Sequence, residues 1–389
     1  MDIFWPIPFK NLNMKKINFF LRYGLCLVII LFFVNPSRIL GKEKKEKTGA
    51  PFGIIQNRDR TNLVKSHERD RRRILKNMEK AMGKLPKRSD LQPLDIQVAD
   101  SLKTDIYTRY TINFEVAENE RVPAYLYIPV QNAPIKKLPA MLVLHGTNLL
   151  GKGVVDGQGT TPNRAHAKEL AQRGYVVIAP DYPSFGDLKD YNFENDRYQS
   201  GTMKGIFNHM RCIDLLQARE DVDAERIGVL GLSLGGHNAM FVGAFDKRLK
   251  VVVSISGWTQ MAYYNVESST SKFGGRLGAW AQQRYMPLLR DKYKLDGDKI
   301  PFDFDEVISA IAPRTFFSVS PLKDENFDVK GVIEGIAKAG KVYSAIGAEN
   351  MLQVRYPDAG HDFPVESRKE AYTFIDKIFG FTPNNVEIK

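Results

Sequence analysis

Cysteine is nearly absent from this chain of 389 residues, which contains only Cys26 and Cys212. Cys26 lies in an apolar run near the N-terminus, so removal of that run would leave Cys212 alone and no internal disulfide could form. Histidine is also sparse: there are six, none in H-x-x-x-H spacing, and no cysteine cluster accompanies them. Because a G-x-G-x-x-G fingerprint and a P-loop are missing too, the sequence predicts no metal and no cofactor.

Long apolar runs are lacking as well. The run from Tyr23 to Val34 is shorter than the roughly 20 residues that a membrane span needs. Basic residues precede it and polar residues follow it, which predicts a secretory signal peptide within residues 1–40, starting at Met1 or at Met14. We therefore expect a secreted or periplasmic protein of a bacterial envelope. Because no A-x-A cleavage site is visible after the run, an uncleaved N-terminal anchor facing the periplasm is the alternative.

Acidic residues are outnumbered, since 45 Asp and Glu stand against 56 Lys and Arg and the net charge is +11. Two short basic runs occur, at residues 41–47 and 69–73, but acidic residues are interleaved with them or adjacent to them. We expect a charged linker over residues 41–65 and then an exposed helix face, rather than a nucleic-acid surface. No nucleic-acid partner is predicted.

Short apolar runs alternate with helical patterns along most of the chain. A helix at 66–82 is predicted within an N-terminal extension over residues 66–100, followed by two alternating strands that suggest an antiparallel start. The predicted strands are 106–116, 124–130, 139–146, 175–183, 226–233, 249–257, 314–321 and 352–363, and the later helices are 163–173, 203–219, 237–245, 329–339 and 368–379. This order predicts an α/β fold over residues 101–389, with a mostly parallel sheet and helices on both faces.

One serine lies between glycines where a buried strand gives way to a helix, in the string Gly231-Leu232-Ser233-Leu234-Gly235. The string G-x-S-x-G arises by chance often enough to be weak alone, so its position must decide. A strand that turns at once into a helix exposes the serine hydroxyl, and glycines remove side chains that would collide in the tight turn. We therefore predict Ser233 as a nucleophile, the alternative being an ordinary tight turn.

A serine nucleophile needs a base and an acid, and both are found in loops after later strands. His361 is the only histidine in a loop after the last strand, so we predict it as the base; His145 is expected to support the loop after its strand, and His237 to point away from the hydroxyl. Asp324 is preferred as the acid over the adjacent Glu325, which stays open as the alternative. The order Ser, Asp, His is that of an α/β-hydrolase triad.

Backbone amides should bind the oxyanion that forms during attack by the serine. Leu234 opens the helix and has a free N–H there, where the helix dipole assists. A second donor is expected from the loop after the strand at 139–146, at Thr147, with Asn148 in reserve.

From about residue 66 to 380 the sequence resembles the exported bacterial α/β-hydrolases grouped with the dienelactone hydrolase and acetyl-xylan-esterase-like families. The strings that carry this likeness are "VLHGTN", "LAQRGYVVIAPDYPSFGD", "SGTMKGIFNHMRCIDLL", "RIGVLGLSLGGHNAMFVGAFD", "APRTFFSVSPLKDENFDV" and "YPDAGHDFP". The resemblance implies the α/β-hydrolase fold and a triad at Ser233, Asp324 and His361. Two departures stand out. Dienelactone hydrolases have a cysteine where Ser233 stands, which counts against dienelactones as substrates. Glucuronoyl esterases have an arginine where Leu234 stands, which counts against their substrate.

Residues 258–300 interrupt the strand–helix rhythm and predict a small cap insertion over the pocket. Its aromatic residues Trp258, Trp280 and Tyr285 are candidates for stacking on a sugar or aryl group, the alternative for each being packing inside the cap.

We therefore expect a secreted or periplasmic serine hydrolase that cleaves carboxylic esters, acting on small-molecule or glycan esters derived from polysaccharides. Two alternatives remain. One is a serine peptidase of the prolyl-oligopeptidase kind, although the N-terminal region is too short for the propeller of those enzymes. The other is a non-catalytic carbohydrate-binding protein on a hydrolase fold.

Overall fold

A computed structural model describes residues 57–88, 91, 93–131, 136–194, 196–264 and 274–388. The predicted signal peptide, and the predicted linker up to residue 56, lie outside the described residues. Within those ranges, no helix is both long and apolar enough to span a membrane.

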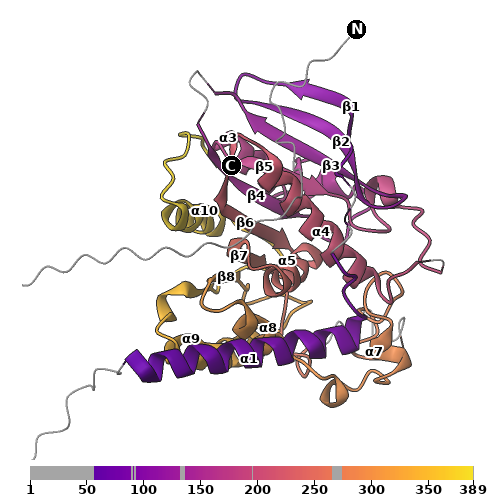
Figure 1. Ribbon diagram of the computed structural model, residues 1–389, viewed down its shortest axis with the longest axis vertical. Helices are drawn as coiled ribbons and strands as arrows, with labels where there is room; N and C mark the ends of the chain where they lie inside the picture. The colour runs from indigo at the N-terminus through magenta and orange to yellow at the C-terminus, as the bar shows by residue number, and fades with distance from the viewer. Residues whose placement is uncertain are drawn as a thin grey trace, which may run out of the picture.

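In the described part of the chain, nine strands form one sheet with the order β1-β2-β3-β5-β4-β6-β7-β8-β9 (Figure 1). The neighbours from β1 to β5 pair antiparallel, and all pairs from β5–β4 to β8–β9 are parallel. The strands are β1 (Ile96–Lys103), β2 (Tyr107–Ala117), β3 (Glu120–Pro129), β4 (Leu138–Leu144), β5 (Val176–Pro180), β6 (Val222–Leu232), β7 (Leu249–Ile255), β8 (Thr315–Val319) and β9 (Leu352–Arg355). The mostly parallel sheet with an antiparallel start is confirmed.

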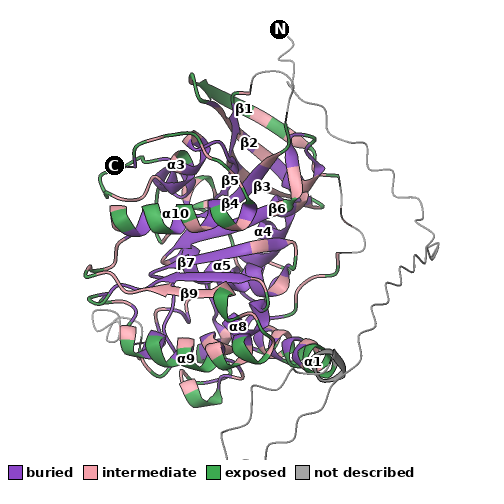
Figure 2. Ribbon diagram, turned by 90° about the vertical axis from the view of Figure 1, so that its left-hand side faces the viewer, coloured by how far each residue is buried: buried purple, intermediate pink, exposed green. Residues whose placement is uncertain are grey.

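Helices cover both faces of the sheet, and the central strands between them are buried (Figure 2). One apolar cluster joins the sheet to α1, α4, α5, α8 and α9, and a second joins the opposite face to α2, α3 and α10. The helices are α1 (Asn57–Met82), α2 (Lys152–Val155), α3 (His166–Gln172), α4 (Gly201–Ala218), α5 (Leu234–Phe245), α7 (Leu288–Asp291), α8 (Phe304–Ile311), α9 (Val329–Ala345) and α10 (Val365–Phe379). Burial on both faces explains why the parallel strands read as continuous apolar runs.

The long helix α1 packs along the outside of the fold, beside α8 (Figure 1). It begins at Asn57 rather than near residue 66. The sequence predicted that the basic run in this helix is exposed. This is wrong for Arg71, which is buried. Its guanidinium donates to the carbonyls of Ala244 and Ala310, at 2.5 and 3.2 Å, near the ends of α5 and α8. A cation at these positions offsets the negative ends of both helix dipoles and anchors α1.

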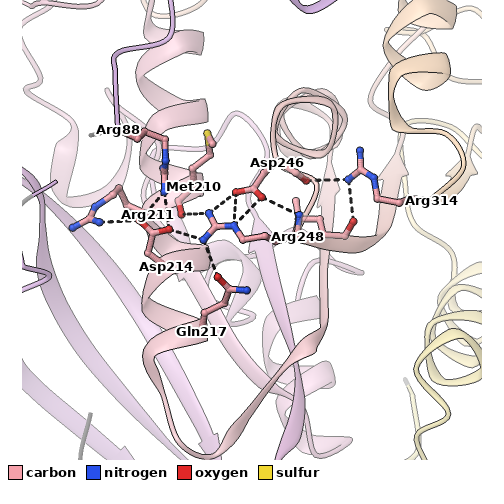
Figure 3. A network of polar contacts seen from close by, with 9 residues as sticks. Arg88, Met210, Arg211, Asp214, Gln217, Asp246, Arg248 and Arg314 are labelled. Atoms are coloured by element: carbon pink, nitrogen blue, oxygen red, sulfur yellow. Dashed lines mark hydrogen bonds and ion pairs between the residues drawn. The ribbon is translucent and has the colours of Figure 1, made fainter. Parts of the chain in front are cut away.

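A network of arginines and aspartates ties α4 and α5 to the sheet (Figure 3). Arg248, just before β7, lies 2.6 Å from Asp214 and 2.5 Å from Asp246. Arg314, just before β8, donates to the Asp246 carbonyl at 2.9 Å, and Arg88 lies 2.7 Å from Asp214. These contacts fix the amino-terminal ends of the two strands. The opposite ends, where open α/β sheets bind ligands, carry the candidate site.

Candidate active site

Ser233 is the single residue between β6 and α5. Its φ of 58° and ψ of −120° lie in a region that L-residues rarely adopt, so the turn is strained. The Ser233 amide donates to the carbonyl of Ile255, the last residue of β7, at 2.9 Å, and the Ser233 hydroxyl does not cap the helix. The neighbouring strand thus holds the turn, which leaves the side chain at the carboxyl end of the sheet.

The glycines around Ser233 are required by close backbone contacts. A Cβ on Gly231 would lie 2.2 Å from the carbonyl oxygen of Gly235, and one on Gly235 would lie 2.1 Å from that of Leu144. On Gly236 it would lie 2.7 Å from the Cα of Gly257. All three contacts are with backbone atoms, which cannot rotate away, so each glycine lets α5 start directly against the strands.

Replacing Gly235 with alanine is expected to lower the free energy of unfolding by about 3 kcal/mol or more, because the added methyl group overlaps the Leu144 carbonyl. Gly340 in α9 is the matched control, since its Cβ would meet no atom closer than 3.9 Å. Gly340→Ala should raise the unfolding free energy by about 0.5–1 kcal/mol through helix propensity. Urea titrations of both variants measure this, and a Gly235→Ala protein as stable as Gly340→Ala would contradict the steric account.

His361 and Asp324 meet at the carboxyl ends of β8 and β9. The Nδ1 atom of His361 lies 3.0 Å from each carboxylate oxygen of Asp324. The Asp324 side chain is 0% exposed, and its Oδ1 also accepts the amides of Asn326 at 2.9 Å and Phe327 at 3.2 Å. These amides fix the carboxylate, so that it orients the His361 ring. Glu325, the alternative acid, is exposed.

The loop that carries His361 is held from its other side by Arg164. One guanidinium nitrogen donates to the His361 carbonyl at 3.0 Å, and another lies 2.6 Å from Asp362. Burial raises the pKa of Asp362, but hydrogen bonds from Arg164, the Phe363 amide and Asn163 outweigh it and leave the pKa below its usual value. The charged pair therefore persists near neutral pH and fixes the backbone of His361.

The relation between Ser233 and His361 is looser than the one between His361 and Asp324. Among the described residues, no hydrogen bond joins the Ser233 hydroxyl to the His361 ring. Phe327 lies near both residues: its ring centre is 5.9 Å from that of His361, and it lines, together with Ser233, the cavity that is described below. The hydrogen bonds of catalytic groups often tighten only when substrate binds.

The loop after β4 is supported by a neutral histidine. His145 accepts the amide of Tyr182 at Nε2, at 3.0 Å, so its Nδ1 carries the proton and donates to the Gly146 carbonyl at 2.7 Å. Burial lowers the pKa of His145. This is the supporting position that the sequence predicted for it.

The same loop is fixed further along by Asp181, just after β5. Its carboxylate accepts the amides of Lys152 at 2.7 Å and Asp187 at 3.0 Å, and the Lys152 ammonium at 2.6 Å. Both Lys152 and Asp181 are buried, so this ion pair is shielded from solvent.

Both amides predicted to bind the oxyanion belong to residues that face the cavity. Thr147 and Leu234 line it together with Ser233. In the described structure, neither amide donates a hydrogen bond to the protein. The hydroxyl of Thr147 lies 3.1 Å from that of Tyr285, which fixes the Thr147 side chain. Both N–H groups are therefore available to a ligand.

A cavity of about 360 Å³ opens beside Ser233. It is lined by Thr147, Ser233, Leu234, His237, Tyr264, Ala279, Trp280, Gln282, Arg284, Tyr285, Asn326 and Phe327. Several of these come from the predicted cap region, and Trp280 stacks on Tyr264 with ring centroids 4.1 Å apart. Tyr264, Trp280 and Tyr285 therefore form an aromatic wall in the same cavity as the serine.

The structure corrects one predicted aromatic contact. The assignment of Trp258 to substrate is wrong: it is 1% exposed, donates to Ser318 Oγ at 3.0 Å and does not line the cavity. Trp280 and Tyr285 do line it. His237 lines the cavity as well. Burial lowers its pKa to about 3, so its ring is neutral near neutral pH.

The remaining histidines lie away from the cavity. His166 and His209 are buried, and burial lowers the pKa of each to about 3; His67 contacts the Ala312 carbonyl at 2.9 Å. Among the histidines in the described ranges, His361 alone has a ring nitrogen within 4 Å of a carboxylate oxygen. In those ranges no group of three or more His, Cys, Asp and Glu side chains is placed to hold a metal ion.

The chain is similar in sequence to known hydrolases and esterases. A family model described as "Glucuronyl esterase, fungi" matches residues 191–347. A Bacillus subtilis protein named as a hydrolase, YtaP, is 26% identical over 313 residues, which cover 78% of this chain and 97% of that protein. A carbohydrate esterase from an unknown prokaryotic organism is 24% identical over 229 residues, covering 54% of this chain and 50% of that protein.

Solved structures agree on the fold. A glucuronoyl esterase from Solibacter usitatus superposes with a TM-score of 0.59 at 18% identity, covering 80% of this chain and 92% of that one. This likeness confirms the α/β-hydrolase fold.

Proposed function

We propose that this chain, a carboxylic ester hydrolase with the α/β-hydrolase fold, works through Ser233 as nucleophile, His361 as base and Asp324 as the acid that orients it. The observation that carries the proposal is the contact of 3.0 Å between His361 Nδ1 and both oxygens of the buried Asp324 carboxylate. This contact leaves Nε2 of His361 free to accept a proton. Ser233, at the end of β6 on the same edge of the sheet, lies on a strained turn beside the cavity.

In the first half of the reaction, His361 Nε2 takes the proton of the Ser233 hydroxyl as its oxygen attacks the ester carbonyl carbon. The carbonyl oxygen becomes an oxyanion and accepts hydrogen bonds from the backbone amides of Leu234 and Thr147. Loss of one such donor typically costs about 3–4 kcal/mol of transition-state stabilisation. His361 then gives its proton to the departing alcohol, and the acyl group remains on Ser233.

In the second half, His361 takes a proton from water as the water oxygen attacks the acyl carbon. Collapse of the intermediate returns that proton to Ser233 and releases the carboxylic acid. Asp324 keeps the Nδ1 proton of His361 in place and stabilises the imidazolium formed in both halves.

The substrate class that we propose is an acylated saccharide derived from a polysaccharide. Relatives of the chain include a carbohydrate esterase, and the wall formed by Trp280, Tyr264 and Tyr285 offers aromatic surface to a sugar ring. The basic and apolar pattern of residues 1–40 supports export, which would bring the enzyme to such substrates.

The proposal is tested with purified protein and a panel of acetylated, feruloylated and methyl-esterified glycans beside peptide amides. Acid should be released from at least one ester class, no amine should be released from the amides, and a fluorophosphonate probe should label the protein. Amine release at comparable rates would point instead to a peptidase. A protein that the probe does not label and that hydrolyses no ester would be a carbohydrate-binding protein.

A further inference from the structure

Arg284 is the only charged side chain among the described residues that line the cavity beside Ser233. The other titratable groups there are tyrosines, whose pKa burial raises at Tyr264 and Tyr285, and His237, whose pKa burial lowers to about 3. All of these are neutral near neutral pH. The cavity therefore carries one positive charge.

Nothing in the described structure neutralises this charge. No carboxylate lies within 4 Å of the Arg284 guanidinium, and none of its N–H groups donates to a described protein atom. Its guanidinium carbon lies 5.5 Å from the centre of the Phe185 ring. A guanidinium held over a ring uses its flat face and keeps its N–H edge free for a planar acceptor. Arg248 and Arg164, by contrast, each pair with an aspartate.

The backbone around Arg284 is fixed against the start of α4. Its carbonyl accepts the Tyr182 hydroxyl at 2.8 Å. The carbonyls of Gln283 and Tyr285 accept the amides of Gly201 and Thr202, at 3.4 and 3.1 Å. A Cβ on Gly201 would lie only 2.1 Å from the Arg284 carbonyl oxygen, so the glycine is what permits this approach. A ligand that binds the guanidinium therefore does not have to order the segment that carries it.

We propose that Arg284 determines specificity by binding an anionic group, a carboxylate or a sulfate, on the saccharide whose ester Ser233 cleaves. The inference rests on the proposed esterase function and narrows its substrate to acidic saccharides. A carboxylate or sulfate presents two coplanar oxygens to the free edge of a guanidinium, which is the strongest arrangement for such a pair. The aromatic walls limit access of water and strengthen the attraction. The ester group is uncharged, so the anion belongs to another position of the sugar.

The test compares three acetylated substrates that differ in one substituent: acetylated glucose, acetylated glucuronic acid and acetylated glucose 6-sulfate. Acetate release by the wild-type protein should show a kcat/KM at least about 10-fold higher for one or both acidic sugars than for the neutral one. The carboxylate and sulfate arms identify which anion is preferred. Arg284→Gln should lower kcat/KM for the preferred acidic sugar about 10- to 100-fold, mainly through KM, and change the neutral sugar less than about threefold. Arg284→Lys should keep part of the preference.

Arg72→Gln is the matched control, because Arg72 is exposed on α1 and outside the cavity. It should leave all three rates unchanged. An equal loss on neutral and acidic sugars in Arg284→Gln would overturn the proposal and assign Arg284 to the oxyanion or to the fold. A wild-type protein that cleaves acetylated glucose without preferring either acidic sugar would overturn it while leaving the esterase function intact. A wild-type protein that no fluorophosphonate labels and that cleaves no ester would overturn both.

Discussion

Replacing Ser233 with alanine is expected to lower kcat for ester hydrolysis by roughly 10⁴-fold or more and to abolish labelling by a fluorophosphonate probe. The reason is chemical: alanine has no oxygen to attack the carbonyl carbon, so the acyl-enzyme cannot form. A small residual rate should remain, because Thr147 and Leu234 still line the cavity and their amides, which donate to no described protein atom, are available to polarise a bound ester. The measurements are acetate release and gel fluorescence after probe treatment.

The fold of Ser233→Ala should be unaffected, which separates loss of chemistry from loss of structure. Both residues carry a Cβ, so the cost of the φ of 58° is the same for each. The hydroxyl caps no helix, and its removal should change the free energy of unfolding by less than about 1 kcal/mol. Ser344→Ala, at an exposed position of α9, is the matched control and should keep full activity. If Ser233→Ala is well folded and retains most of the activity, the proposed nucleophile is wrong.

The order of the elements was predictable from the sequence because the parallel strands are covered on both faces. A strand such as β6 must be apolar from Ile227 to Leu232, and no exposed position interrupts the run. The rule that parallel strands end on one edge then brings Ser233 to the same edge as the loops that carry Asp324 and His361. This topology brings Asp324 and His361 together, and the amides of Asn326 and Phe327 then fix the carboxylate.

Elements at the margins of the sheet were not predictable in the same way. The edge strand β1 is largely exposed, so its sequence carries no sustained apolar alternation. It is a strand because it pairs with β2. Helix α8 is short and lies at the end of a stretch without a clear rhythm, and α1 and α9 pack against it. Its local signals, an apolar face and the Asp303 cap, were outweighed by the irregular stretch before it.

Residues of the cavity wall were the least predictable. Trp258 and Trp280 both belong to the predicted cap region and both are buried in the same apolar cluster, yet Trp280 lines the cavity and Trp258 does not. Composition cannot distinguish them, because the difference is set by how the irregular segment folds back onto α4 and α5. Arg284 could not be singled out from the sequence for the same reason: only the structure shows that it lines the cavity without a described carboxylate partner.

Asp324→Asn is expected to lower kcat by about 10³- to 10⁴-fold, whereas Glu325→Gln should stay within about twofold of the wild type. Asparagine has nearly the same shape and can still accept the amides of Asn326 and Phe327, so the loop should remain in place. It carries no charge, however, to stabilise the imidazolium of His361. If its amide N–H faces Nδ1, the ring proton moves to Nε2, where a lone pair is needed to accept the serine proton.

The neighbouring residue provides the control for this prediction. Glu325 is exposed and pairs with no described cation or histidine, so Glu325→Gln removes the same charge one position along the chain. Initial rates on one acetylated substrate, with thermal unfolding of both variants, separate catalysis from stability. A large loss in Glu325→Gln with a small one in Asp324→Asn would transfer the acid role to Glu325. Equal losses in both would indicate that general electrostatics near the loop, rather than an oriented pair, sustain the base.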